Sequence, residues 1–471
     1  MPVAGAEARG RVLGTLAGLE HDRLTAPELG EAVEAIAAGA EADSEWQAQA
    51  REARRRIRRA TALPRRLAEA LAEAASSGLA AWQEARRQNH FAPFAPALER
   101  LLALKREQAR CLADGGPLYD ALLDEFEPGA RESDLVPLFA ALRARLVPLV
   151  RAVVESGRVA DESPLRGRFP MEAQRQLGRF VAGEIGFDWR AGRLDLSAHP
   201  FCTGIARRDV RLTWRGQEED LRQALMGVLH EMGHGLYDQG LPESWEGTPL
   251  GEAASTAVHE SQSRLWEILV GRGRPFWQWL LPHVRHAFPG HAPELDAIWP
   301  ALHAIRPTLI RVEADEATYN LHVLVRFELE RALFAGGLEV ADLPAAWDDL
   351  YDEVLRVRAP DPRQGVLQDL HWGGGLFGYF PTYTLGTLAA VQLFDTAKRA
   401  LGDLDAQLAR GEFAPLLSWL REHVHRHGAR YPPRELLERA TGAPASAEPF
   451  LAYLEGVAEE VYGVEVAGSR A

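Results

Sequence analysis

The amino-acid sequence predicts a mainly helical, all-α protein with a small β-sheet near its functional site. The chain of 471 residues is rich in Ala, Leu, Arg and Glu, which all favour helices. Apolar residues recur at spacings of three and four along several long segments, whereas one short segment alternates with period two. Because no Gly/Ser linker or internal repeat divides the chain, we expect one large helical unit with two lobes.

Helices are predicted over most of the first 118 residues. Breaks are expected near residues 62–64 and 92–96, where prolines interrupt the pattern. The helical pattern returns over much of residues 135–187.

A short strand is predicted over residues 209–215. Val210, Leu212 and Trp214 alternate with polar neighbours, which is typical of a half-buried strand. A small structural hairpin with residues 193–197 is one role for this strand. Binding of an extended peptide through its main chain is another.

The clearest helix is predicted over residues 221–240. Its apolar positions form one stripe, made of Leu221, Leu225, Val228, Met232 and Leu236. Acidic residues at 218–220 favour the helix start, and Gly240 followed by Leu241-Pro242 favours its end.

Two histidines of this helix fall off the apolar stripe. His230 and His234 are one turn apart, so they can bind one metal ion through neutral nitrogens. Glu231 lies beside them and can take a proton from a water molecule. This is the HExxH pattern of zinc hydrolases. Buried structural histidines would be expected on the apolar stripe, so the pattern favours metal ligation.

A catalytic zinc needs a third protein ligand and an open position. The metzincin pattern is disfavoured, because Tyr237 and Gly240 stand where it requires Gly and His. A Glu from a second helix is the other common solution, and residues 251–271 offer Glu252, Glu260 and Glu267. Spacing alone leaves Glu252 and Glu260 equally open.

The sequence resembles the thermostable carboxypeptidase (carboxypeptidase Taq) family of zinc metallopeptidases. Six ordered motifs carry the resemblance: HPF at 199–201, DxRxT at 209–213, HExxH at 230–234, HES at 259–261, IRxxAD at 310–315 and GxxQDxHW at 365–372. The resemblance implies that Glu260 is the third ligand of a zinc ion, which cobalt can replace. It also implies a homodimer that removes C-terminal residues from peptides with broad specificity.

An enzyme of this kind must recognise a free carboxylate, for which a planar guanidinium is the best side chain. We expect Arg311 to bind it, on a helix from about residue 303 to 334, with Arg326 in reserve. An ion pair between Arg311 and Asp315 is the structural alternative. The resemblance further implies that Arg211 limits the substrate groove.

A glycine-rich loop is predicted over residues 365–386. Gln368, Asp369 and His371 are expected to line the site, and Asp369 is one possible acceptor for a ligand histidine. Tyr383 and His199 are candidates for binding the oxyanion or the peptide carbonyl.

In the predicted reaction, Glu231 takes a proton from the attacking water and delivers it to the leaving amine. An endo-acting zinc oligopeptidase on a related helical scaffold is the nearer alternative. A non-enzymatic helical binding protein is the more remote one. The intact Glu231 and both histidines disfavour the second alternative.

The composition points to a cytoplasmic protein. A net charge of −14 disfavours nucleic-acid binding, which requires a basic face. Only two cysteines occur, and neither a membrane-spanning apolar stretch nor a signal-peptide pattern is found. Peptides and a second copy of the chain are the expected partners, without a membrane.

We expect one catalytic unit over residues 1–471, two-lobed with a deep groove as in other helical peptidases of this type. Residues 1–130, approximately, are expected to cover the groove, and residues 131–471 to carry the catalytic part. Family members usually begin with further helical turns, so a family N-terminal helix is expected to be absent from this chain.

Overall fold

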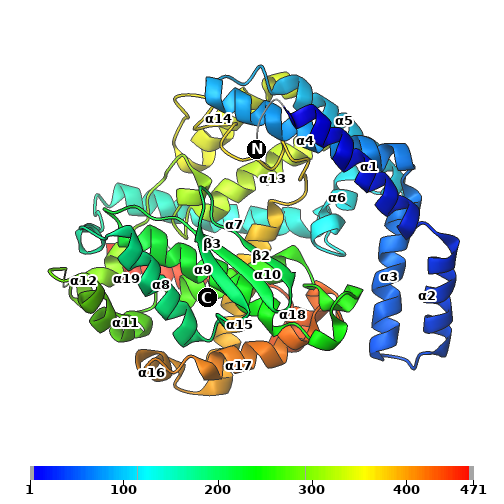
Figure 1. Cartoon of the computed structure of the whole chain (residues 1–471). Helices are drawn as coiled ribbons and strands as arrows, with labels where there is room; N and C mark the ends of the chain where they lie inside the picture. Colours follow the sequence, from blue (N-terminus) through cyan, green and yellow to red (C-terminus); the bar gives the residue numbers. More distant parts are fainter. Residues whose placement is uncertain (1–4, 114, 292, 466–471) are drawn as a thin grey trace. The chain divides into compact units, whose positions relative to one another are not determined.

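The computed structural model describes residues 5–113, 115–291 and 293–465 (Figure 1). Helices dominate these residues, and one three-stranded sheet accompanies them, which confirms the predicted fold class. None of the described helices is long and apolar enough to cross a membrane.

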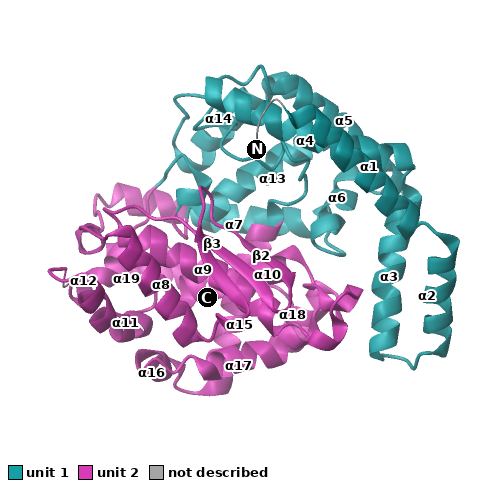
Figure 2. Cartoon of the chain, viewed as in Figure 1, with its two compact units in different colours: residues 1–147, 307–314, 318–381 teal, residues 148–306, 315–317, 382–471 magenta. Residues whose placement is uncertain are grey.

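The chain forms two compact units, drawn in teal and magenta in Figure 2. Unit 1 contains residues 1–147, 307–314 and 318–381, and unit 2 contains residues 148–306, 315–317 and 382–471. A single cut near residue 130 does not describe this division, because the chain returns to unit 1 after residue 306. The covering role of the first 130 residues stays a prediction.

Unit 1 is helical throughout its regular described segments. Its helices are α1 Ala6–Leu24, α2 Pro27–Gly39, α3 Glu45–Ala62, α4 Arg65–Gln88, α5 Ala95–Leu112, α6 Leu118–Phe126, most of α7 Glu132–Glu155, α13 Tyr319–Ala335 and α14 Leu343–Leu355, with 3₁₀ turns η6 Arg311–Glu313 and η7 Val340–Asp342. Both predicted breaks are found, before α4 and before α5. Two further breaks, at residues 25–26 and 40–44, were not predicted.

Unit 2 contains the sheet and the remaining helices. The helices are α8 Met171–Ile185, α9 Leu221–Gly240, α10 Thr256–Arg264, the π-helix η5 Leu265–Val270, α11 Arg274–Ala287, α12 Leu295–Leu302, α15 Pro381–Leu401, α16 Leu404–Ala409, α17 Ala414–His423, α18 Pro433–Thr441 and α19 Glu448–Tyr462. Its 3₁₀ turns are η2 Ser163–Leu165, η3 Glu243–Trp245, η4 Pro249–Gly251 and η8 His425–His427.

The sheet has the strand order β1-β3-β2, with β1 Gly192–Leu196, β2 Cys202–Ala206 and β3 Asp209–Trp214. The predicted strand is confirmed as β3, and its alternating Val210, Leu212 and Trp214 are buried. The expected hairpin of β1 with β3 is wrong, because the two strands are parallel. The chain first returns through β2, which is antiparallel to β3.

This arrangement also corrects the expected role of β3 in binding peptide. Both edges of β3 are already paired, with β1 on one side and β2 on the other. Its main-chain groups are therefore used within the sheet, and an extended peptide cannot pair with them.

Two capped helices carry the HExxH and HES motifs. The Asp220 carboxylate accepts a hydrogen bond from the Arg222 amide at 2.8 Å and so begins α9. The Ser255 hydroxyl accepts one from the Val258 amide at 3.0 Å and begins α10. A side chain at Gly233 would place its Cβ 2.6 Å from the Gln262 carbonyl oxygen. The glycine of HEMGH thus allows α10 to approach α9 closely.

Two predicted elements differ from the structure. The helix expected from about residue 303 begins only at Tyr319, because Pro307 cannot continue a helix, and Arg311 instead lies in the 3₁₀ turn η6. The loop expected to extend to Gly386 ends earlier, because Pro381 opens α15 and its ring suits a first helical turn. Tyr383 therefore stands on a helix.

Candidate metal centre

Three potential metal ligands converge in unit 2. His230 and His234 come from α9 and Glu260 from α10, and their ligand atoms lie within 4.8 Å of one another. Glu260 Oε2 is 3.4 Å from His234 Nε2 and 3.8 Å from His230 Nε2. Ligand atoms at about 2.0–2.1 Å from a tetrahedral ion stand about 3.3 Å apart. The donor set therefore fits a divalent cation, and Glu252 lies exposed outside it.

The second nitrogen of each ligand histidine has its own partner. His230 Nδ1 lies 2.9 Å from Glu267 Oε2. His234 Nδ1 lies 3.1 Å from the His259 carbonyl oxygen and 2.6 Å from the His259 Nδ1. With Nδ1 engaged in this way, each Nε2 is directed at the ligand set. Asp369, a possible acceptor in the sequence, instead binds two arginines.

Arg264 fixes the carboxylates around the ligands. Its Nε donates to Glu260 Oε1 at 2.8 Å, and its Nη1 donates to Glu267 Oε2 at 3.2 Å. Burial would raise the pKa of Glu260, but Arg264 and the histidines hold it well below its usual value. Burial would also raise the pKa of Glu267, but Arg264 and His230 outweigh it and lower that pKa to about 2. Both groups are therefore anionic at neutral pH.

Glu231 is the one carboxyl of this group that titrates near neutrality. Its residue is 6% exposed, and burial is the main cause that raises its pKa to about 7. A carboxyl with this pKa can accept a proton and later return it. Its position beside His230 on α9 matches the expected role of general base.

The two ligand histidines differ in basicity. Burial alone would lower the pKa of His230, but Glu260 and Glu267 raise it to about 9. Burial dominates at His234 and lowers its pKa to about 4. A histidine must be neutral to bind a metal ion. A cation bound here at neutral pH would therefore displace a proton from His230 but not from His234.

The second turn of α15 lies against Glu260. A Cβ at Gly386 would stand 2.6 Å from the Glu260 Cβ, so only glycine allows this approach. Tyr383 is three residues earlier on the same helix face and is half-buried. The structure thus places Tyr383 on the side of α15 that faces Glu260.

Two other predicted residues lie on the sheet and its connections. His199 is exposed between β1 and β2, with its Nδ1 2.7 Å from the Pro200 carbonyl oxygen. Arg211 is exposed on β3 and pairs with Asp209 at 2.7 Å. The HPF and DxRxT motifs are joined, because the Phe201 amide donates to the Thr213 hydroxyl at 2.8 Å.

The other predicted residues form a second cluster, in unit 1, that we call the arginine cluster: Arg311, Arg326 and Asp369. Asp369 Oδ1 accepts from Arg311 Nη2 at 2.7 Å, and Oδ2 accepts from Arg326 Nε at 2.9 Å. Despite burial, the two guanidinium groups hold the pKa of Asp369 well below its usual value. Two positive groups face one negative group, so the cluster carries a net positive charge.

Gln368 and His371 surround this cluster. Gln368 Oε1 accepts from the Arg311 amide at 2.9 Å, and its Nε2 donates to the Leu309 carbonyl at 3.0 Å. His371 is buried, with its Nδ1 4.0 Å from Asp369 Oδ1. Asp315, the partner of Arg311 in the structural alternative, accepts hydrogen bonds from the amides of Arg306 and Ala317.

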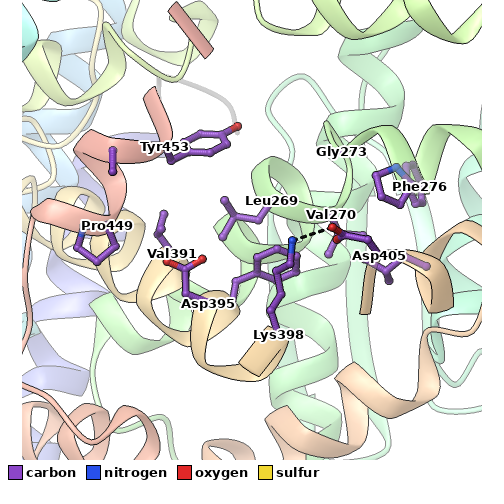
Figure 3. A pocket seen from close by; sticks show the side chains of 14 residues that line it. Leu269, Val270, Gly273, Phe276, Val391, Asp395, Lys398, Asp405, Pro449 and Tyr453 are labelled. Carbon is purple, nitrogen blue, oxygen red and sulfur yellow. Dashed lines mark hydrogen bonds and ion pairs between the residues drawn. The ribbon is translucent and has the colours of Figure 1, made fainter. Parts of the chain in front are cut away.

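A separate cavity of about 420 Å³ lies in unit 2 (Figure 3). Apolar side chains such as Leu269, Phe276 and Phe394 line most of it, and Lys398 pairs with Asp405 at 2.8 Å. None of the three potential metal ligands lines this cavity. This cavity and the ligand cluster are therefore separate features of unit 2.

Comparison with known proteins shows to which family the chain belongs. Residues 1–457 match the family described as Carboxypeptidase Taq (M32) metallopeptidase. The chain belongs to this family. The resemblance seen in the six sequence motifs is confirmed. Membership makes the chain a metallocarboxypeptidase and supports neither an endo-acting oligopeptidase nor a non-enzymatic binding protein.

Several M32 relatives are similar over most of their length. Thermostable carboxypeptidase 1 of Thermus thermophilus is 47% identical, over 98% of this chain and 93% of the relative. Carboxypeptidase 1 of Bacillus subtilis is 40% identical, over 81% of this chain and 77% of the relative. The crystal structure of the M32 carboxypeptidase from Deinococcus radiodurans R1 gives a TM-score of 0.92 at 41% identity, over 98% of this chain and 94% of that one.

The residues that support the ligands were not predicted from the sequence. Glu267 was considered only as a ligand, and His259 only as part of a motif. One signal was available: Glu267 is seven residues after Glu260, on the same helix face, within an otherwise apolar run. For His259 no comparable signal exists, because its partner is on another helix.

Proposed function

We propose that this M32 enzyme removes residues one at a time from the C terminus of peptides, with broad specificity and with zinc as its metal. Cobalt is proposed to replace zinc with retention of activity. The observation that carries the proposal is the convergence of His230, His234 and Glu260 beside the buried Glu231. Nitrogen and carboxylate ligands in this number suit a catalytic zinc site with one open position.

A divalent ion held by these three residues supplies a Lewis acid that lowers the pKa of water and polarises the scissile carbonyl. Glu231 takes the proton of the attacking water and passes it to the leaving amine. Its pKa of about 7 supports both steps. Tyr383 is proposed to donate a hydrogen bond to the developing oxyanion, and His199 to bind a peptide carbonyl.

Recognition of the terminal carboxylate is proposed for Arg311. The net positive charge of the arginine cluster supports this role, since a buried cation excess favours an incoming anion. Arg326 is completely buried, whereas Arg311 is 4% exposed, so Arg311 is the better candidate. Gln368 and Asp369 orient Arg311, and His371 lines the same cluster. Arg211 is proposed to limit the length of the bound peptide.

The reaction class can be tested on a defined peptide mixture. Digestion with the purified protein, followed by mass spectrometry, is expected to give ladders that shorten by one residue from the C terminus. A chelator should stop the digestion, and one equivalent of Zn²⁺ should restore it. Internal fragments, or ladders that persist in the chelator, would contradict the proposal.

A homodimer is also proposed. Helix α1 supports it, because four large apolar side chains of this helix are exposed, Val12, Leu13, Leu16 and Leu19, between 45% and 58%. Such an exposed apolar face favours contact with another protein surface. Light scattering should give twice the chain mass of 51.9 kDa. The double variant L16E/L19E should be a monomer, and a monomeric parent protein would refute the dimer.

The proposed partners are peptides, rather than nucleic acids or membranes, and the proposed location is the cytoplasm. The net charge of −14 and the presence of only two cysteines support these assignments.

A further inference from the structure

The two ligand histidines are supported by different chemistry. His230 Nδ1 contacts a carboxylate directly, through Glu267 Oε2 at 2.9 Å. His234 Nδ1 contacts another imidazole, that of His259, at 2.6 Å between the two Nδ1 atoms, and it lies 3.1 Å from the His259 main-chain carbonyl oxygen. The rings of His234 and His259 lie with their centroids 4.6 Å apart and their planes inclined by 30°. The His259 imidazole therefore contacts His234 Nδ1, whereas the Glu267 carboxylate contacts His230 Nδ1.

The contact made by His259 Nε2 shows which ring nitrogen of His259 carries the hydrogen. His259 Nε2 lies 3.0 Å from Asp238 Oδ1, and a carboxylate can only accept a hydrogen bond. Nε2 of His259 therefore carries the hydrogen and donates it. In a neutral imidazole the other nitrogen is then an acceptor, so His259 Nδ1 accepts from His234 Nδ1–H.

This order of donors has a consequence for the metal ligand. Since Nδ1 of His234 carries the hydrogen, its Nε2 has the free electron pair. That nitrogen is the one that lies 3.4 Å from Glu260 Oε2, within the ligand set. The hydrogen bonds from Asp238 through His259 to His234, together with the His259 carbonyl, thus favour the tautomer that can bind a cation.

Asp238 is held in position by elements on both sides. It follows His234 by four residues on α9, so both side chains share one helix face. Cys202 Sγ of β2 lies 3.8 Å from Asp238 Oδ2, and a Cβ at Gly204 of β2 would lie 3.0 Å from the same oxygen. The strand β2 therefore packs directly on this carboxylate.

We propose that Asp238 and His259 are positioning residues that fix His234 as a metal ligand through a carboxylate–imidazole–imidazole relay. The inference rests on the proposed metal role of His230, His234 and Glu260. Loss of such an outer partner typically lowers metal affinity 10- to 100-fold.

The test uses the full-length protein and Co²⁺ as the probe, measured by equilibrium titration and by visible absorption. His259→Leu removes the imidazole acceptor of His234 and leaves only the main-chain carbonyl of residue 259, so it should weaken Co²⁺ binding by about 10- to 100-fold, with a changed absorption spectrum. His259→Asn places a carbonyl oxygen near the position of Nδ1 and should recover most of the affinity and the spectrum. Asp238→Ala should weaken binding less than His259→Leu, because the acceptor itself remains.

Cys111→Ala is the matched control, since Cys111 is a free cysteine on α5 in unit 1 and takes no part in the relay. Its Co²⁺ affinity should equal that of the parent protein. If His259→Leu fails to fold, as judged by circular dichroism, Asp238→Ala decides the question. Parent-like affinity and spectrum in the folded relay variants would overturn the relay and leave the metal site standing. Absence of Co²⁺ binding by the parent protein would instead overturn the proposed function.

Discussion

The metal centre of unit 2 and the arginine cluster of unit 1 are both buried ionic groups, but they have opposite charge. Around the metal ligands, once His230 is neutral as metal binding requires, the three carboxylates of Glu231, Glu260 and Glu267 outnumber the two guanidinium groups of Arg264 and Arg272. In the other cluster, two arginines face the single carboxylate of Asp369.

The difference indicates what each cluster binds. A buried ionic cluster that served stability alone would be expected to balance its charges, because an uncompensated buried charge is costly. The acidic excess around His230 and His234 suits a cation, and the basic excess around Arg311 suits an anion. A metallocarboxypeptidase needs both, one for the metal and one for the terminal carboxylate.

The largest effect is expected from removing the third ligand. Glu260→Ala should lose bound metal and all measurable activity, because two histidines cannot retain the ion alone. Metal content after gel filtration, measured by mass spectrometry, checks this. Glu252→Ala is the matched control and should keep one metal ion per chain. One bound metal ion per chain in Glu260→Ala would show that another residue is the third ligand.

The next largest effect should come from Glu231→Gln. This change keeps the size of the side chain and removes the base, so kcat should fall by about 10²- to 10⁴-fold. The three ligands are untouched, and metal content should stay at the parent level. Retained turnover would contradict the assignment of Glu231 as the general base.

A smaller effect is expected from pH, which should change metal binding but not the binding of a carboxylate to the arginine cluster. The pKa of about 9 at His230 means that a proton competes with the metal below pH 9. The apparent Kd for Zn²⁺ should therefore rise about tenfold for each pH unit from 9 down to 7, as measured with a competing chelator. A pH-independent Kd in this range would show that His230 binds the metal without losing a proton.

The arginine cluster should keep its charge over the same range. Arginine remains protonated, and the pKa of Asp369 is held far below neutrality. Binding of a peptide carboxylate to this cluster should therefore not follow the pH dependence of metal binding.

The smallest effect is expected at the sheet. Arg211→Ala removes an exposed ion pair, so the thermal midpoint should barely change. If Arg211 limits the groove, kcat/KM for long peptides should rise while that for dipeptides stays constant. Arg193→Ala is the matched control, because Arg193 is the register partner of Arg211 on β1 and is also exposed. Equal behaviour of the two variants would remove the special role of Arg211.

The sequence predicted those features that depend on local periodicity. Helix α9, its buried stripe and the position of His230 and His234 off that stripe follow from spacings within 20 residues. The choice of Glu260 required the family resemblance, since spacing left Glu252 open.

Features that depend on distant contacts were not predictable. Arg311 was expected to bind a substrate carboxylate, with an ion pair to Asp315 as the alternative, and its contact with Asp369, which lies 58 residues further along the chain, was not predicted. The alternation of β3 did not reveal that both its edges are paired. Similarly, the role of His259 depends on the close packing of α10 on Gly233, which a single sequence does not encode locally.

The opposite charges of the two clusters are tested most directly by comparing a peptide with its C-terminal amide. The account predicts that the enzyme cleaves the free acid with a kcat/KM at least about 30-fold higher, which corresponds to a charged hydrogen-bonded pair of about 2 kcal/mol. Arg311→Ala should lower cleavage of the acid to the level of the amide without loss of metal. Equal cleavage of acid and amide by the parent enzyme, or an unchanged preference in Arg311→Ala, would contradict the assignment of the arginine cluster to carboxylate recognition.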